Sequence, residues 1–124
     1  MTTKTQPKKK ARDRSIPEVQ GVCPMPNIAQ LIGGKWKLII LQILIFQGMK
    51  RFNELRRQID GITQTMLTNQ LRALERDGFV GRKIYAEVPP RVEYTATDRA
   101  HALEKTFLAM HDWWVAEEKR IADD

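Results

Sequence analysis

The chain has 124 residues, and its 21 Lys and Arg against 15 Asp and Glu give a formal net charge of +6 at pH 7. This length suits one compact domain with a tail, and a single cysteine excludes an internal disulfide framework. The longest apolar run, residues 38–46, is about half as long as a membrane span, and no apolar stretch follows the N-terminal lysines as in a signal peptide. We therefore expect a cytoplasmic protein without a membrane partner.

Charge is unevenly distributed along the chain. Residues 1–14 carry a net charge of +5 and residues 15–34 carry −1, whereas residues 35–91 carry +6 and residues 92–124 carry −4. A basic central block followed by an acidic segment is typical of a polyanion-binding module attached to a part that does not bind polyanions.

The first 20 residues contain two prolines, little apolar content and three consecutive lysines, Lys8 to Lys10. We expect a disordered basic arm over residues 1–20 and one folded domain over residues 21–124. The arm is either a solubilising tail or a segment that follows a nucleic-acid backbone and adds salt-dependent affinity.

Two helices are expected at the start of the folded domain. A short helical turn is predicted over residues 27–31, capped by Asn27 and ended by two glycines. The segment from Lys35 to Gln47 is apolar on nearly all sides and is followed by Gly48, so we predict that it is the buried core helix.

The next segment has the pattern of two helices joined by a tight turn. Residues 51–59 carry apolar side chains at i, i+3 and i+7, which predicts a short amphipathic helix. The turn over residues 60–62 places Gly61 where a left-handed residue is needed, and Thr63 is a suitable N-cap for the helix that follows. This arrangement predicts a helix-turn-helix.

The second helix of this motif has two different faces. Leu67, Leu71 and Leu74 form an apolar stripe, while the other face carries amide, hydroxyl and guanidinium groups that suit base edges. An ordinary solvated face would look the same in isolation. Its position after a short basic helix and a glycine turn favours a recognition helix in the major groove of double-stranded DNA. The predicted base contacts are Gln64, Thr65, Thr68, Asn69 and Arg72.

Two alternating segments, residues 80–86 and 91–96, flank a Pro-Pro turn and predict the strands of a two-stranded wing. We therefore expect an α+β fold, mainly α, of the winged helix-turn-helix class. Basic side chains on the helix-turn-helix and on the wing are candidate phosphate contacts. For the wing residues, the alternative is that they are exposed to solvent and contact no DNA. The candidates are Arg51, Arg56, Arg76, Arg82, Lys83 and Arg91.

A long C-terminal helix is expected from Thr97, as N-cap, to about Ile121, a length of roughly 37 Å. Bulky apolar side chains recur along it at helical spacing. This stripe, Leu103, Phe107, Met110 and Trp114, is predicted to form a homodimer interface. The alternative is a stripe that packs only on its own domain.

An ordered series of motifs resembles the HxlR-type bacterial winged helix-turn-helix regulators, over roughly residues 23–114. The motifs are Cys23-Pro24, Gly33-Gly34-Lys35-Trp36, Arg51-Phe52-Asn53-Glu54-Leu55, Met66-Leu67-Thr68, residues 71–78 and residues 87–94. The resemblance implies a homodimer, joined by N- and C-terminal helices, that binds an inverted-repeat operator on the bacterial nucleoid. One departure occurs at residues 96–100, which read Ala-Thr-Asp-Arg-Ala where the family usually has Leu-Thr-Glu followed shortly by Gly. The Thr cap and the acid of the first turn are kept, so the start of the last helix is still expected here. The side-chain packing beneath that start is not predicted by the resemblance.

The same resemblance implies a role for Cys23, because similar regulators use a cysteine at this position to sense oxidants or electrophiles. Structural retention without sensing is the alternative, and no Lys or Arg is adjacent in sequence. Aromatic residues are a second candidate site for an effector that remains unknown, but simple core packing is the alternative for them. They are Trp36, Phe46, Phe107, Trp113 and Trp114.

An enzyme is the rival class, and the residue inventory argues against it. His101 and His111 are ten residues apart on one expected helix, so they point in different directions and do not form a metal site together. Residues 33–35 lack the spacing of a phosphate-binding loop. We expect no cofactor, metal or catalytic residue. A winged helix that contacts proteins rather than DNA is the remaining alternative.

Overall fold

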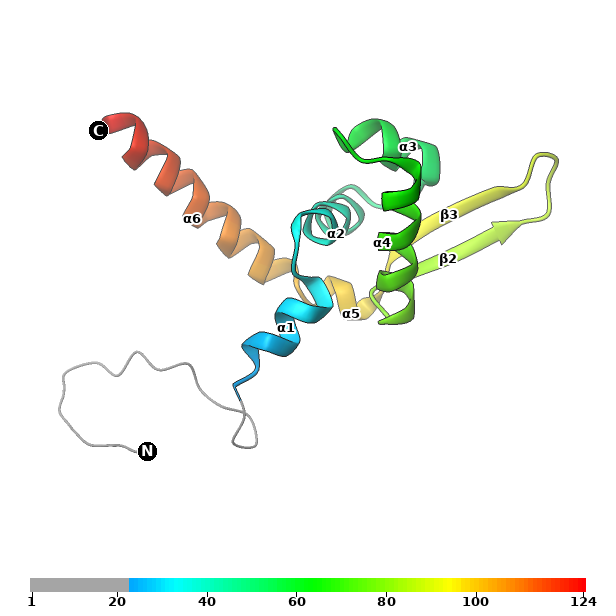
Figure 1. Cartoon of the computed structure of the whole chain (residues 1–124), viewed down its shortest axis with the longest axis horizontal. Coiled ribbons are helices and arrows are strands. Elements are labelled where there is room, and N and C mark those ends of the chain that lie inside the picture. The colour runs from blue at the N-terminus through cyan, green and yellow to red at the C-terminus, as the bar shows by residue number, and fades with distance from the viewer. Residues whose placement is uncertain (1–22) are drawn as a thin grey trace.

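The computed structural model describes residues 23–124, so the arm predicted over residues 1–20 lies outside the described residues. The chain forms six helices and three strands within this range, and the mainly helical fold class is confirmed (Figure 1). In chain order they are α1 (Met25–Ile32), α2 (Lys35–Gln47), β1 (Lys50–Arg51), α3 (Phe52–Gln58), α4 (Gln64–Arg76), β2 (Val80–Tyr85), β3 (Arg91–Ala96), α5 (Asp98–His101) and α6 (Glu104–Asp123).

Helix α2 forms the centre of the core, as its composition predicts. It spans Lys35–Gln47, and five of its side chains, including Ile40, Leu41 and Leu44, are buried. Leucines of α3 and α4 pack into the same core cluster. Burial of side chains of this size contributes about 1.5–3 kcal/mol each, so this cluster fixes the positions of the surrounding helices.

Helix α1 begins earlier than the sequence pattern indicates. Its N-cap is Pro24 rather than Asn27, and the helix starts at Met25. The reason is that Pro24 and Pro26 both have φ fixed near the helical value and need no hydrogen-bond partner for a backbone N–H in the first turn. Asn27 therefore lies inside the first turn of the helix.

The helix-turn-helix is confirmed in α3 and α4. Ile59 and Ile62, on either side of the turn, are buried, and Gly61 between them adopts φ +84°, a left-handed conformation that glycine tolerates best. Thr63 then caps α4, because its Oγ1 accepts a hydrogen bond from the backbone N–H of Met66 at 3.1 Å.

The sheet has three antiparallel strands in the order β1-β3-β2, so the two-stranded wing is confirmed with one additional strand at its base. The β2–β3 hairpin pairs Val80 with Ala96 and Tyr85 with Arg91. Strand β1 is only two residues long and pairs Lys50 with Tyr94. The hairpin projects from the body of the domain beside α3 and α4 (Figure 1).

The prediction of a single helix from Thr97 to about Ile121 is wrong in one respect, because the chain here forms two helices, α5 and α6. Thr97 is the N-cap of α5 as predicted, but Leu103 donates its N–H to the carbonyl of Ala100 and so forms a tighter turn. This turn lets both Ala100 and Phe107 be buried in the core. Packing of these two side chains in the core thus interrupts the helix, although the sequence here contains no local helix breaker.

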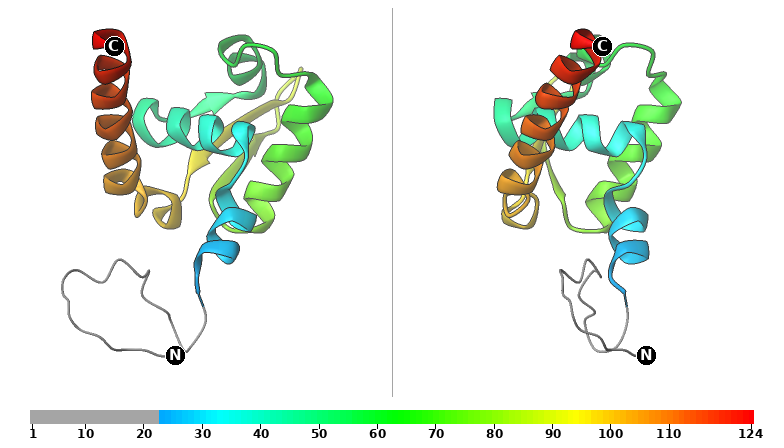
Figure 2. Two further views of the ribbon diagram at one scale, coloured as in Figure 1. Left: turned by 60° about the vertical axis from the view of Figure 1, so that its left-hand side comes forward. Right: turned by 90° about the vertical axis from the view of Figure 1, so that its left-hand side faces the viewer.

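Helix α6 then runs along one side of the molecule, and both α1 and α6 lie on the side away from the wing (Figures 1 and 2). No single helix within residues 23–124 has the length and apolar composition to cross a membrane; α1 and α2 pass that test only as a pair bent by 74°.

Candidate nucleic-acid interface

Helix α4 presents a polar face to solvent because its apolar face is fully used. Leu67, Leu71 and Leu74 are at most 2% exposed and anchor the helix on the core. At 100° per residue, the predicted base contacts occupy an arc of about 140° that excludes these leucines. Gln64, Thr65, Asn69 and Arg72 are exposed and Thr68 is half-buried.

The C-terminal end of α4 is fixed to the start of α5 by side-chain hydrogen bonds. Thr97 Oγ1 donates to the carbonyl of Gly78 at 2.7 Å, and Gly78 adopts φ +85°. Arg99 donates to the carbonyl of Asp77, and its guanidinium lies 4.5 Å from the centre of the Phe79 ring. Thr97, which keeps the family's Thr, and Arg99, which lies in the stretch that departs from the family pattern, therefore hold the end of α4 against the start of α5.

Two of the predicted phosphate contacts form surface ion pairs at this end of α4. Arg76 Nε lies 3.2 Å from Asp77 Oδ1, and Arg82 Nε lies 3.1 Å from Glu75 Oε2. The hydrogen bond from Arg76 lowers the pKa of Asp77 and raises that of Arg76. Ion pairs this exposed contribute little to stability, so either arginine can exchange its carboxylate for a phosphate at little cost.

The basic residues of the wing do not share one face. Arg82 and Tyr94 are register partners on the face toward α4, where burial raises the pKa of the Tyr94 hydroxyl. Lys83 and Arg91 lie on the opposite face. There they flank the Tyr85 ring, with Lys83 Nζ at 4.9 Å and the Arg91 guanidinium at 3.9 Å from its centre.

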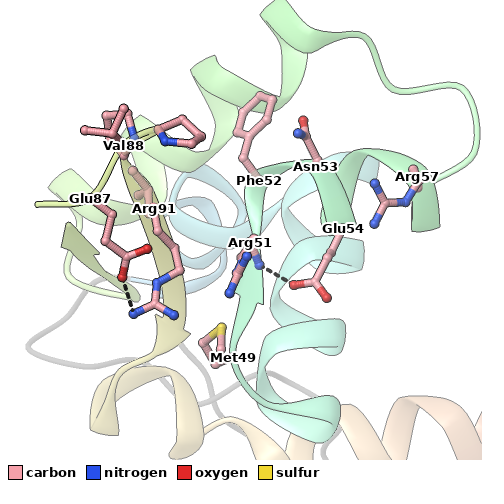
Figure 3. Close-up of a pocket in the computed structure, with 12 residues that line it drawn as sticks. Met49, Arg51, Phe52, Asn53, Glu54, Arg57, Glu87, Val88 and Arg91 are labelled. Atoms are coloured by element: carbon pink, nitrogen blue, oxygen red, sulfur yellow. Dashed lines mark hydrogen bonds and ion pairs between the residues drawn. The ribbon is translucent and has the colours of Figure 1, made fainter. Parts of the chain in front are cut away.

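Arg51 and Arg91 meet in a pocket between α3 and the wing, which has a volume of about 720 Å³ (Figure 3). The sequence pattern did not select Arg57, which also lines this pocket. An exposed arginine on a short helix gives no signal of its own, since only the fold brings residues 49–57 next to residues 87–92. Arg56, one residue earlier, is exposed and does not line the pocket.

Cys23 is exposed and forms no disulfide. It lies immediately before Pro24, the N-cap of α1. Its side chain is therefore accessible at the start of α1, a helix that lies on the side of the molecule away from the wing (Figure 1).

The predicted dimer stripe divides into two parts. Leu103 is half-buried and Phe107 is 7% exposed, so both pack on the core of their own chain. Further along α6, Met110 and Trp114 are 44% and 49% exposed. Trp113, beside Trp114 at a ring-centre distance of 6.2 Å, is 64% exposed.

The five aromatic residues considered as an effector site do not come together. Trp36 packs against the core and Phe107 belongs to it, whereas Phe46, Trp113 and Trp114 are exposed. None of them lines the pocket between α3 and the wing. Within residues 23–124 no group of three His, Cys, Asp or Glu could hold a metal ion.

Known proteins with this sequence pattern and fold are regulators. Residues 31–121 match the family model described as HxlR-like helix-turn-helix. The chain is 49% identical over 109 residues to the uncharacterized HTH-type transcriptional regulator YdeP of Bacillus subtilis (strain 168). The aligned region covers 88% of this chain and 84% of that protein.

The structure is similar to those of the redox regulator HypR in two states. For the oxidized form the TM-score is 0.70 at 48% identity, over 76% of this chain and 96% of that chain. For the reduced form the TM-score is 0.75 at 43% identity, over 82% of this chain and 100% of that chain.

Proposed function

The chain belongs to the HxlR-like helix-turn-helix family of transcriptional regulators, whose motif implies DNA binding, and from that premise we propose a specific mode of action. The protein acts as a homodimer on an inverted-repeat operator, with one α4 in the major groove of each half-site. Half-sites then lie about 34 Å apart on one side of the duplex.

The face of α4 carries this proposal. Its amide and hydroxyl side chains and Arg72 point to solvent from a helix that is capped by Thr63 and anchored by buried leucines. Such a helix is rigid, and rigid donors and acceptors discriminate between base edges. Arg72 suits guanine, and Asn69 suits adenine.

Exposed apolar residues on α1 and α6 support the homodimer. Met25 and Ile28 on α1 are 46% and 42% exposed, and α6 adds Met110, Trp113 and Trp114. Aromatic and methionine side chains of this size are enriched at interfaces and rare as free surface. A two-fold interface on these helices leaves both copies of α4 and the wing free for the operator.

Oxidation of Cys23 is the proposed means of modulation, and the similarity to the redox regulator HypR supports it. The chain has one cysteine, so a disulfide must join two protomers. The two sulfurs form one bond, while two protons and two electrons pass to the oxidant. Accessibility of the thiol is the other supporting observation.

Binding to DNA in increasing salt tests the proposed function. An operator is first selected from a pool of random-sequence duplexes, and a scrambled duplex of the same length serves as control. We expect specific binding that exceeds control binding by a factor of about 1,000 or more, with both weakened by salt. Equal affinity for the two duplexes at every salt concentration would contradict the proposal and favour a module that contacts proteins.

A further inference from the structure

The pocket between α3 and the wing, referred to below as the α3–wing pocket, has the size and composition of a small-molecule site. Its volume of about 720 Å³ lies within the usual range for ligand pockets, about 300–1,000 Å³. Figure 3 shows that one wall comes from β1 and α3 and the other from the end of the wing. Residues 49–54 and 57 form the first wall, and residues 87–92 form the second.

Three arginines from three elements line the pocket, and two of them have no carboxylate partner. Arg91 pairs with Glu87, with Nη2 and Oε2 3.0 Å apart, and its Nε lies 3.8 Å from Oε2 of Glu93, which does not line the pocket. Arg51 and Arg57 form no ion pair with any residue in the described part of the chain. The other acidic side chain, Glu54, accepts a hydrogen bond from the backbone N–H of Arg51 at 2.8 Å. The pocket therefore has a net positive charge that its own carboxylates do not neutralise.

The remaining walls are largely apolar. Phe52 and Val92 are half-buried, and the exposed residues Met49, Asn53 and Val88-Pro89-Pro90 complete the lining. A few charged groups among apolar side chains are typical of sites that orient a ligand through its polar end and bury its body. A fully hydrated inorganic anion would leave these apolar surfaces without a partner.

We infer that the α3–wing pocket binds a small organic carboxylate with a compact apolar body. Guanidinium groups bind carboxylates through paired, charge-assisted hydrogen bonds, and Arg51 and Arg57 can supply them. The apolar body then packs on Phe52 and the two prolines. A DNA strand is the other polyanion to consider, but its hydrated phosphates would leave the apolar surface of Phe52 and the two prolines without a partner.

A bound carboxylate lowers the affinity of the protein for DNA. It neutralises positive charge beside the end of the wing and ties the wing to α3, so both the electrostatic field and the position of the wing change. The two binding events are reciprocal, and DNA must weaken carboxylate binding by the same factor. This regulatory part rests on the proposed DNA-binding function, whereas carboxylate binding itself does not.

Benzoate is a suitable probe, and benzamide is its neutral match in size and shape. The full chain, labelled with ¹⁵N, is titrated with each compound in the absence of DNA. We expect saturable amide shifts confined to residues 49–57 and 87–92 with benzoate and none with benzamide. The change Arg51→Gln should weaken benzoate binding by about tenfold, the loss expected for one charge-assisted hydrogen-bonding group. Arg56→Gln, the same change on the same helix outside the pocket, should leave benzoate affinity unchanged.

Three results would overturn the inference. Equal shifts with benzamide would show that charge does not select the ligand. Equal loss of benzoate affinity in Arg51→Gln and Arg56→Gln would show that the overall positive charge of this surface, and not the pocket, attracts benzoate. Shifts at the pocket with duplex DNA but none with benzoate would assign the pocket to the DNA interface. Because operator binding is measured separately without benzoate, each of these results leaves the proposed function standing.

Discussion

Replacement of Thr97 by valine tests how α4 is fixed to the C-terminal helices. Thr97 Oγ1 donates to the carbonyl of Gly78 at 2.7 Å and accepts from the N–H of Ala100 at 3.3 Å. Valine has nearly the same shape and makes neither bond. Loss of an N-cap costs about 1 kcal/mol, and loss of a partly buried hydrogen bond costs about 1 kcal/mol more. We expect the free energy of unfolding to fall by about 2 kcal/mol.

Urea unfolding followed by far-UV circular dichroism measures this change. All variants are compared at one protein concentration, because the stability of a dimer depends on concentration. The urea midpoint should fall with an unchanged slope, and the midpoint of thermal unfolding should fall by roughly 10 °C. Thr97→Ser keeps both hydrogen bonds and is the matched control. A loss below about 0.5 kcal/mol in Thr97→Val, or an equal loss in Thr97→Ser, would refute the reasoning.

Three further predictions concern the dimer, the turn after α4 and the cysteine. Trp114→Glu should yield a monomer by light scattering, because it places a charge in the proposed interface, whereas Lys119→Glu, on the face of α6 away from Met110, Trp113 and Trp114, should remain dimeric. A dimeric Trp114→Glu would mean that the exposed stripe is not the interface. Gly78→Ala should cost about 1–2 kcal/mol of unfolding free energy, because the residue adopts φ +85°; an unchanged urea midpoint would contradict this. Diamide should produce a cross-linked dimer on a non-reducing gel and change operator affinity in the wild type, and Cys23→Ser should abolish both effects; an equal response of the two proteins would exclude sensing through Cys23.

Local signals in the sequence were sufficient to predict the central part of the fold. The bounds of α2 follow from a nearly continuous apolar segment between glycines. Those of α4 follow from apolar periodicity and from residues such as Thr63 and Gly61, which fix a helix start and a turn by themselves. The polar face of α4 follows from the same periodicity, because buried leucines leave only one face for solvent.

Features that depend on distant contacts were not predictable in this way. Strand β1 is two residues long and exists only through its pairing with β3. The break between α5 and α6 follows from the burial of Ala100 and Phe107, while the sequence between them contains neither glycine nor proline. The α3–wing pocket unites segments at least 30 residues apart in the chain, and no spacing rule connects them.

The central claim is that α4 reads bases while the wing contacts only the backbone. Affinities of Arg72→Ala and Lys83→Ala for the selected operator and for a random duplex test it most directly. We predict that Arg72→Ala loses about 1–3 kcal/mol on the operator, relaxes preference at one position and changes random binding little, whereas Lys83→Ala weakens binding to both duplexes alike. Equal losses on operator and random DNA for both variants would contradict the assignment of α4 as the recognition helix.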